Sequence, residues 1–298
     1  MKKFIAIAGV ALIATLTVNA GLVTSWSDDF NGADGTVVAP SAKWALTNVV
    51  WQAMGVPNWN THDRASNNED VYIISNNQFY TYLGPCTLYT NVSERQKVQA
   101  SFIPQESGTP VAVLLSNGIV TLEVDLADMW GNDGEAPWGS PNQEIKIALP
   151  CTSIITDTHK VTNYYQIAFK IDKYSSSNYA VYAQSGTKTI GAKSFANVDY
   201  ASLPVLPKSA KLTVQNVAGD AVAKLYIDGN FVGMTNAFTA AQMATLYPYI
   251  WEGRFSGGGA EISDGALFLD NYSVAWVPEP SVFLLTLLAI PLWRKFRS

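Results

Sequence analysis

The sequence predicts an all-β protein whose main domain is a single β-sandwich. Apolar and polar residues alternate with period two along much of the chain, most clearly in residues 164–171, 211–217 and 224–228. Gly, Asn and Asp turn signals separate such runs, and within the domain only residues 239–246 resemble a helix, with Thr239 as its cap. Many strands, frequent turns and almost no helix are typical of two packed sheets.

Further strands and their connections follow from the same pattern. Residues 218–221 are a turn-like break, so the runs on either side of them are expected to form a hairpin. Asp228 and Gly229 turn the chain into the next strand, and residues 175–178 are expected to be a hairpin loop. The remaining expected strands are residues 71–75, 78–83, 97–103, 111–115, 119–126 and 179–183.

The first 20 residues have the three parts of a secretory signal peptide. Lys2 and Lys3 are followed by an apolar run over residues 4–18, and small residues precede a cleavage point after Ala20. The alternative is an uncleaved membrane anchor, but the apolar run is short for a span. We therefore expect an exported chain with its β-domain over residues 21–276.

Residues 277–298 form a distinct tail. Pro278, Glu279 and Pro280 precede an apolar run over residues 282–293, which would rise only about 18 Å as a helix, less than the roughly 30 Å hydrocarbon core of a bilayer. The run suits a short, transient membrane segment held by a basic, cytoplasmic end. The alternative is a last core element with a basic end. The basic residues are Arg294, Lys295 and Arg297.

This tail resembles the sorting signal of PEP-CTERM proteins. The likeness rests on the Pro-Glu-Pro motif at 278–280, the short apolar run and the basic end, in a chain that also begins with a signal peptide. It implies recognition by an exosortase, a transpeptidase-like membrane enzyme. It also implies delivery to the bacterial cell surface, envelope or extracellular matrix.

The net charge of the domain limits the classes of partner that it is expected to bind. Between Gly21 and Trp276 lie 14 of the 19 Lys and Arg residues and 23 of the 24 Asp and Glu residues, a balance of −9 against −5 for the whole chain. Such an acidic domain argues against nucleic acid and anionic lipid as partners. Cys86 and Cys151 are either a disulfide, which an oxidising compartment permits, or two free thiols.

The domain resembles concanavalin A-like, laminin-G-type jelly rolls. The likeness is carried by the opening residues 28–36 with Trp44 soon after, by the hairpin over residues 223–229, and by the closing strand over residues 266–274. In many such folds the first and last strands are neighbours. Asp28, Asp29 and Asp270 lie at these strands, so a structural Ca²⁺ site is one expectation, with ordinary turn aspartates as the alternative.

A short acidic run offers a catalytic hypothesis. Glu123 and Asp125 point to one face if residues 119–126 form a strand. The run resembles the Glu-x-Asp-x-x-Glu strand of laminarinase-like glycoside hydrolases, which would make Glu123 the nucleophile, Asp125 an aiding carboxylate and Asp128 the acid/base. Asp128 is shorter than the family's glutamate. The alternative is the solvent-facing side of an amphipathic strand.

Tryptophan-rich segments offer a binding hypothesis. Indole rings stack on the apolar faces of sugars, and neighbouring amides and carboxylates bind the hydroxyls. The alternative is that these rings cover the ends of the sandwich. The candidate glycan-binding residues, expected in loops over residues 51–63 and 129–139, are Trp51, Trp59, Trp130 and Trp138.

These observations favour a non-enzymatic, exported protein associated with the envelope or with exopolysaccharide, with a polysaccharide and an exosortase-type enzyme as partners. Two alternatives stay open: a glycoside hydrolase that uses Glu123 and Asp128, and a purely structural matrix protein.

Overall fold

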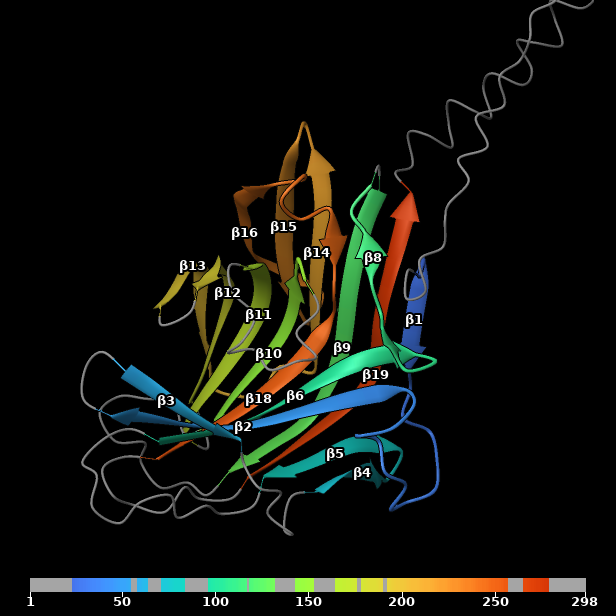
Figure 1. The fold of residues 1–298 in the computed structure, drawn as a ribbon, viewed down its shortest axis with the longest axis vertical. Coiled ribbons are helices and arrows are strands. Elements are labelled where there is room, and N and C mark those ends of the chain that lie inside the picture. Colours follow the sequence, from blue (N-terminus) through green and yellow to red (C-terminus); the bar gives the residue numbers. More distant parts are fainter. Residues whose placement is uncertain are drawn as a thin grey trace, which may run out of the picture.

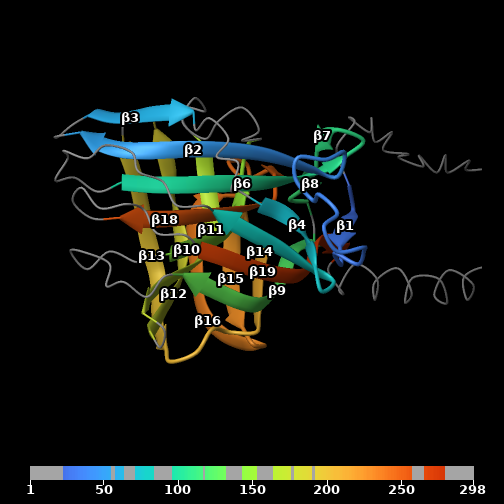
Figure 2. The same ribbon diagram turned by 90° about the horizontal axis from the view of Figure 1, so that it is seen from below.

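The expected all-β jelly-roll sandwich is confirmed. The computed structural model describes residues 23–54, 58–63, 71–83, 96–116, 118–131, 143–152, 164–175, 178–189, 192–256 and 265–278. Across these residues, two antiparallel sheets pack face to face, and the chain passes between them several times, in runs of one to four strands (Figures 1 and 2). None of the described residues belongs to a helix long and apolar enough to cross a membrane.

The eight-stranded sheet has the order β16-β15-β14-β9-β19-β5-β4, and β1 pairs with β19 beside β5. The expected pairing of the first and last strands is thereby confirmed. Its strands are β1 (Ser25–Asp28), β4 (Val71–Ser75), β5 (Gln78–Leu83), β9 (Gly118–Gly131), β14 (Ser209–Val217), β15 (Asp220–Ile227), β16 (Asn230–Thr239) and β19 (Gly265–Pro278).

The nine-stranded sheet has the order β13-β12-β11-β10-β18-β6-β2-β3, and the short β7 (Thr109–Pro110) pairs with β6. A separate two-stranded pair joins β8 (Val113–Leu114) and β17 (Thr245–Leu246). The other strands are β2 (Trp44–Met54), β3 (Asn58–Asp63), β6 (Gln96–Glu106), β10 (Gln143–Pro150), β11 (Tyr164–Ser175), β12 (Asn178–Thr189), β13 (Ala192–Leu203) and β18 (Tyr249–Ser256).

The core lies between the sheets because alternate residues of each strand point inward. In β9, Leu122 and Val124 are buried while Glu123 and Asp125 stay partly exposed on the opposite face. An aromatic cluster closes the end beside β1, where the Phe30 and Phe79 rings lie 5.2 Å apart and the Phe79 and Phe102 rings 5.0 Å apart. Two more large aromatic side chains, Trp44 and Tyr272, are also fully buried at this end of the core.

Three expectations need correction. Residues 239–246 are not a helix: Thr239 caps a single turn, accepting a hydrogen bond from the Gln242 N–H at 3.3 Å, and the chain then enters β17. Residues 51–54 and 58–63, expected in a loop, are strand residues, because β2 and β3 form a ladder there. Within residues 111–115, only Val113 and Leu114 form a strand.

The last strand extends into the first residues of the predicted tail. β19 runs to Pro278, which stands opposite Gly118 in the ladder with β9. The first two residues of the predicted tail, Val277 and Pro278, are therefore the end of the sandwich. Glu279, Pro280 and the basic end lie outside the described residues, as does the signal peptide.

Candidate functional site

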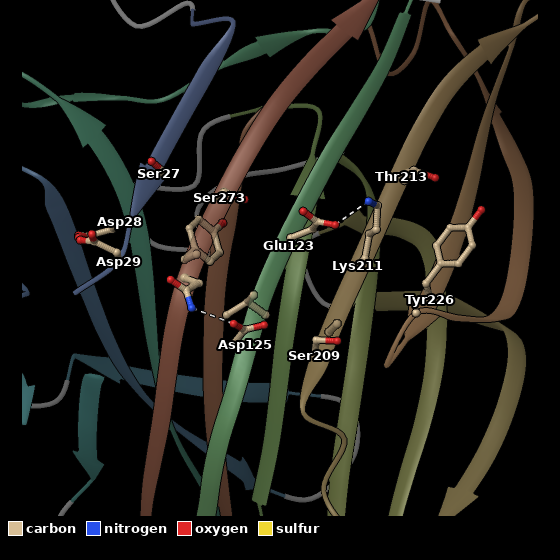
Figure 3. Close-up of a pocket in the computed structure, with 15 residues that line it drawn as sticks. Ser27, Asp28, Asp29, Glu123, Asp125, Ser209, Lys211, Thr213, Tyr226 and Ser273 are labelled. Atoms are coloured by element: carbon tan, nitrogen blue, oxygen red, sulfur yellow. Dashed lines mark hydrogen bonds and ion pairs between the residues drawn. The ribbon is translucent and has the colours of Figure 1, made fainter. Parts of the chain in front are cut away.

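A groove of about 820 Å³ crosses the outer face of the eight-stranded sheet, away from the core (Figure 3). Most of its lining residues come from β1, β9, β14, β15 and β19, and most of them carry hydroxyl, carboxylate or amide groups. Ligand pockets for small molecules typically measure roughly 300–1,000 Å³. The residues with such polar groups are Ser27, Asp28, Asp29, Glu123, Asp125, Ser209, Lys211, Thr213, Tyr226, Asn271, Tyr272 and Ser273.

One row of residues, paired across neighbouring strands, runs along the groove. Glu123 stands opposite Lys211 on one side and Ser273 on the other. Ser273 faces Ser27, and Lys211 faces Tyr226. Adjacent strands lie about 4.8 Å apart, so the row from β1 to β15 spans about 19 Å. The groove is therefore an elongated surface that extends across five strands.

Two polar contacts hold the centre of the groove. Lys211 Nζ lies 2.5 Å from Glu123 Oε1, an ion pair in which both side chains are nearly half exposed. The Asn271 side-chain amide donates to Asp125 Oδ2 at 2.8 Å. Asn271 reaches outward because β19 bulges between Asp270 and Ser273, and its φ of 48° lies in the left-handed region that Asn tolerates.

An aromatic pair ends the row. Tyr226 lines the groove, and its ring lies 5.8 Å from that of Phe231 on β16 in an edge-to-face arrangement. Phe231 is 57% exposed, unusual for a large apolar side chain. The groove therefore joins an accessible aromatic surface to a polar floor (Figure 3).

The three aspartates predicted to bind Ca²⁺ do not form that site. Asp28 is buried, and its carboxylate accepts the Trp44 indole N–H at 2.7 Å and pairs with Lys43 Nζ at 2.8 Å. The Asp28 carboxylate is therefore already engaged in contacts that stabilise the fold. In the part of the chain that the structure describes, no group of three or more His, Cys, Asp or Glu side chains is arranged to hold a metal ion.

The structure separates the three predicted catalytic carboxylates. Glu123 and Asp125 share the outer face of β9 as expected, and both line the groove. Asp128 does not line it. A bulge in β9 opposite Phe268 and Leu269 shifts the register before Asp128, whose carboxylate accepts the N–H of Met129 at 2.7 Å. The arrangement offers no acid/base carboxylate beside Glu123 from position 128.

Two of the four predicted tryptophans lie on strands of the other sheet. Trp51 on β2 stands opposite Thr61 on β3, and Trp59 stands opposite Ala53, so both belong to the edge of the nine-stranded sheet. Trp130 lies near the end of β9. Trp138 lies outside the described residues.

The outer face of the nine-stranded sheet carries a buried charged cluster. Lys170 Nζ lies 2.5 Å from Glu144 Oε1 and 2.8 Å from Asp172 Oδ1. Burial lowers the pKa of Lys170, but the two carboxylates outweigh it, so the pKa is raised. Trp251, also buried, holds Lys146 Nζ 4.7 Å from its ring centre. Because these charged groups pair with one another, we interpret the cluster as structural rather than as a ligand-binding site.

Cys151 is a free thiol in the structure. Its Sγ accepts a hydrogen bond from the Tyr165 N–H at 3.3 Å. Of the two alternatives for the cysteines, the structure has the unpaired one at Cys151. Cys86 lies outside the described residues.

No protein-family model matches the chain, and no curated protein matches its sequence. Solved structures resemble it distantly. A LamA protein of Z. galactanivorans, in complex with laminaritriose and laminaritetraose, is 12% identical at a TM-score of 0.46, covering 85% of this chain and 98% of its own. Bacillus licheniformis β-glucanase is 11% identical at a TM-score of 0.43, with coverages of 86% and 99%. The carbohydrate recognition domain of Emp46p is 11% identical at 0.41, with coverages of 77% and 88%.

Sequence reasoning missed much of this site. Glu123, Asp125 and Asp29 were candidates, but Lys211, Tyr226 and Asn271 were not. Lys211 and Tyr226 lie on the polar sides of strands that the alternation predicts correctly. Only the order β15-β14-β9-β19 shows that these sides form one surface.

Proposed function

We propose that this chain is an exported glycan-binding protein of the bacterial envelope or extracellular matrix, which binds an oligosaccharide in the groove over β9. One observation carries the proposal: the row from Ser27 to Tyr226 combines hydroxyl, carboxylate and ammonium groups with an accessible aromatic pair at one end. A sugar presents the matching surfaces, an apolar C–H face and a ring of hydroxyls.

The contacts within the groove support binding rather than catalysis. Glu123 is paired with Lys211, and Asp125 accepts the Asn271 amide. Both carboxylates keep further lone pairs that can accept sugar hydroxyls. The Lys211 ammonium is a donor for hydroxyl oxygens. These groups give orientation, and the Tyr226 ring gives apolar area.

Export and sorting are the second half of the proposal. The predicted signal peptide and the PEP-CTERM-like tail support delivery outside the cytoplasm and handling by an exosortase-type enzyme. The acidic balance of the domain, −9, disfavours anionic lipid as its binding partner. Glycan is the abundant hydroxylated polymer that such a location offers.

The groove is tested by calorimetric titration of the full-length chain, in mild detergent because of its apolar tail, with glucose and N-acetylglucosamine hexamers. We expect saturable binding to at least one hexamer. Tyr226→Ala should weaken it by about tenfold or more, because an aromatic contact at a binding centre contributes at least 1–2 kcal/mol. Tyr247→Ala removes a half-buried tyrosine that does not line the groove and serves as the control.

Two results would contradict this assignment. Equal binding by the wild type and Tyr226→Ala would show that the ligand does not bind in the groove. Loss of binding in Trp59→Ala with no effect of Tyr226→Ala would move the site to the nine-stranded sheet.

A further inference from the structure

The first and last described residues of the domain lie at one end of the sandwich. The Trp276 N–H donates to the Thr24 carbonyl oxygen at 2.7 Å, so the residues that follow the predicted signal peptide lie beside those that precede the predicted tail. The start of β9 lies there too, because Gly118 stands opposite Pro278. The turn between β14 and β15 is at the same end of the eight-stranded sheet (upper part of Figure 1).

The segments that form this end are almost uncharged. They contain one charged residue, Asp220, although 14% of the whole chain is charged. By contrast, three of the six residues over 123–128, further along β9, are carboxylates. Hydrogen bonds of 2.7–2.9 Å connect the segments, from the N–H groups of Val23, Leu115 and Ala240 to the carbonyl oxygens of Ala112, Ala244 and Gly219. The segments are residues 23–26, 112–121, 213–223, 235–247 and 274–278.

A row of apolar side chains crosses the outer face of the eight-stranded sheet at this end. Val277 faces Ile119, and Gln215 stands between Ile119 and Val222. Val217, the last residue of β14, follows on the same face. Val277 is 52% exposed and Val217 45%, and the other two apolar side chains are half-buried. Exposed apolar side chains that gather on one surface mark a site of contact with a protein or a membrane.

The predicted tail indicates what covers this apolar row. Its apolar run begins at residue 282, four positions after Pro278, and four extended residues span at most about 14 Å. The headgroup region of a bilayer adds roughly 5–8 Å on each side of the hydrocarbon core. When the run enters the hydrocarbon core, this end of the sandwich is therefore held at the headgroups or just outside them.

We propose that this uncharged end of the sandwich, with the apolar row of Val277, Ile119, Val222 and Val217, contacts the headgroup region of the bilayer while the tail is inserted. This inference rests on the sorting half of the proposed function and adds the orientation of the domain. Lipid is the occupant because the tail brings a bilayer within reach of the row. The contact is apolar, so the acidic balance of the domain does not oppose it.

This orientation leaves the glycan groove in water. Glu123 lies five residues beyond Gly118 along β9, about 17 Å from the end that faces the lipid. The groove runs across the strands, from Ser27 to Tyr226. It therefore lies roughly parallel to the membrane surface, where a polymer outside the membrane can reach it.

Depth measurements on the full-length chain test the contact. The protein carries Cys86→Ser and Cys151→Ser, with a bimane label at Ser116→Cys or Val205→Cys, in phosphatidylcholine vesicles that contain nitroxide headgroups. Ser116 is exposed beside the start of β9. Val205, 67% exposed, precedes the start of β14, which lies about 26 Å from Val217. The nitroxide should quench the label at position 116 at least about fivefold more strongly than at 205, because the headgroup region is thin.

A matched pair of charge variants separates contact from tethering by the tail. Val217→Asp places a hydrated carboxylate in the proposed contact, so it should reduce the quenching at position 116 about twofold. Val205→Asp makes the same change at the far end and should leave this quenching unaltered. Both valines are exposed, so both variants should fold, which melting curves check.

Vesicle-bound protein with equal quenching at positions 116 and 205 would overturn the inference alone, and so would quenching that Val217→Asp leaves unaltered. Self-association in detergent that Val217→Asp abolishes would assign the row to a second copy of the chain and would also overturn it. Absence of the wild type from floated vesicles would overturn the sorting half of the proposed function and this inference together, whereas the glycan titration tests the groove separately.

Discussion

Asp270, which stands opposite Asp125 in the ladder between β9 and β19, is a residue whose negative charge opposes folding. Its pKa is raised above the ordinary 3.8, first by burial and then by the charges of Asp125 and Asp29. Because the folded state binds this proton more tightly than the unfolded state, ionised Asp270 destabilises the fold. That destabilisation is present above the raised pKa and is lost as the pH falls below 3.8.

Asp270→Asn should therefore stabilise the protein at pH 7. The gain should be no more than about 1 kcal/mol, because the site is largely open to solvent. The Asn271 N–H now donates to Asp270 Oδ1 at 2.8 Å, and an asparagine oxygen can accept it equally. Urea unfolding at pH 7 and pH 3 measures the difference, which should shrink at pH 3. Lower stability of the variant at pH 7 would show that the carboxylate stabilises the fold instead.

Residue-level predictions from sequence succeeded where they needed only one strand. Alternation along β9 was enough to place Glu123 and Asp125 on one polar face. Their partners were not predictable, because the contact between Asn271 and Asp125 joins residues 146 positions apart. The inward turn of Asp28 was missed for the same reason, since Trp44 is the residue that its carboxylate binds.

At the scale of elements, two-residue turns set the hairpins of the eight-stranded sheet. Asn76 and Asn77 join β4 to β5, and Ala218 and Gly219 join β14 to β15, all with positive φ. Such turns match the twist of the strands, and Asn-Gly is the preferred sequence. Ala218 is the exception, because its φ of 53° crowds an alanine side chain.

Ala218→Asn should stabilise the protein by about 0.5–1 kcal/mol, because asparagine tolerates the left-handed region better than alanine. The change does not touch the groove, so glycan binding should be unaltered. Asn77→Ala, with a φ of 57° at the native residue, is the mirror experiment and should destabilise the protein by a similar amount. Chemical unfolding of both variants checks the pair; opposite signs to those expected would mean that the turns do not limit stability.

Turn chemistry is local, so sequence predicted the hairpin between β14 and β15 and the turn at Asp228 and Gly229. The predicted helix over residues 239–246 failed because the capping pattern of Thr239 and Gln242 serves one turn as well as a helix. The tryptophan segment over residues 51–63 was expected to be a loop because its Gly, Pro and Asn residues are turn signals, but pairing between β2 and β3 prevails.

For the whole molecule, composition and strand pattern were sufficient to predict a sandwich, whereas the order of its strands was not predictable. The groove depends on that order, since β1, β9 and β19 are distant in sequence from one another and from most of the β14–β15 hairpin. The last strand runs to Pro278, which is paired with Gly118. The proposed sorting motif, residues 278–280, therefore begins with the last residue of that strand.

Replacing Glu279 and Pro280 by alanine should cause the protein to accumulate in the membrane fraction of its native host, if the tail is a transient sorting signal. Pro278 is left unchanged because it belongs to β19. Fractionation and immunoblotting of the wild type and the variant give the comparison. Stable membrane retention of the wild type would indicate a permanent anchor.

Glycan binding in the groove over β9 is tested most directly by a crystal structure of the protein with a bound hexasaccharide. Sugar rings should lie against Tyr226, with hydroxyls within hydrogen-bond distance of Glu123 and Asp125. Sugar density on the nine-stranded sheet, or an empty groove at saturating hexasaccharide, would contradict the proposed function.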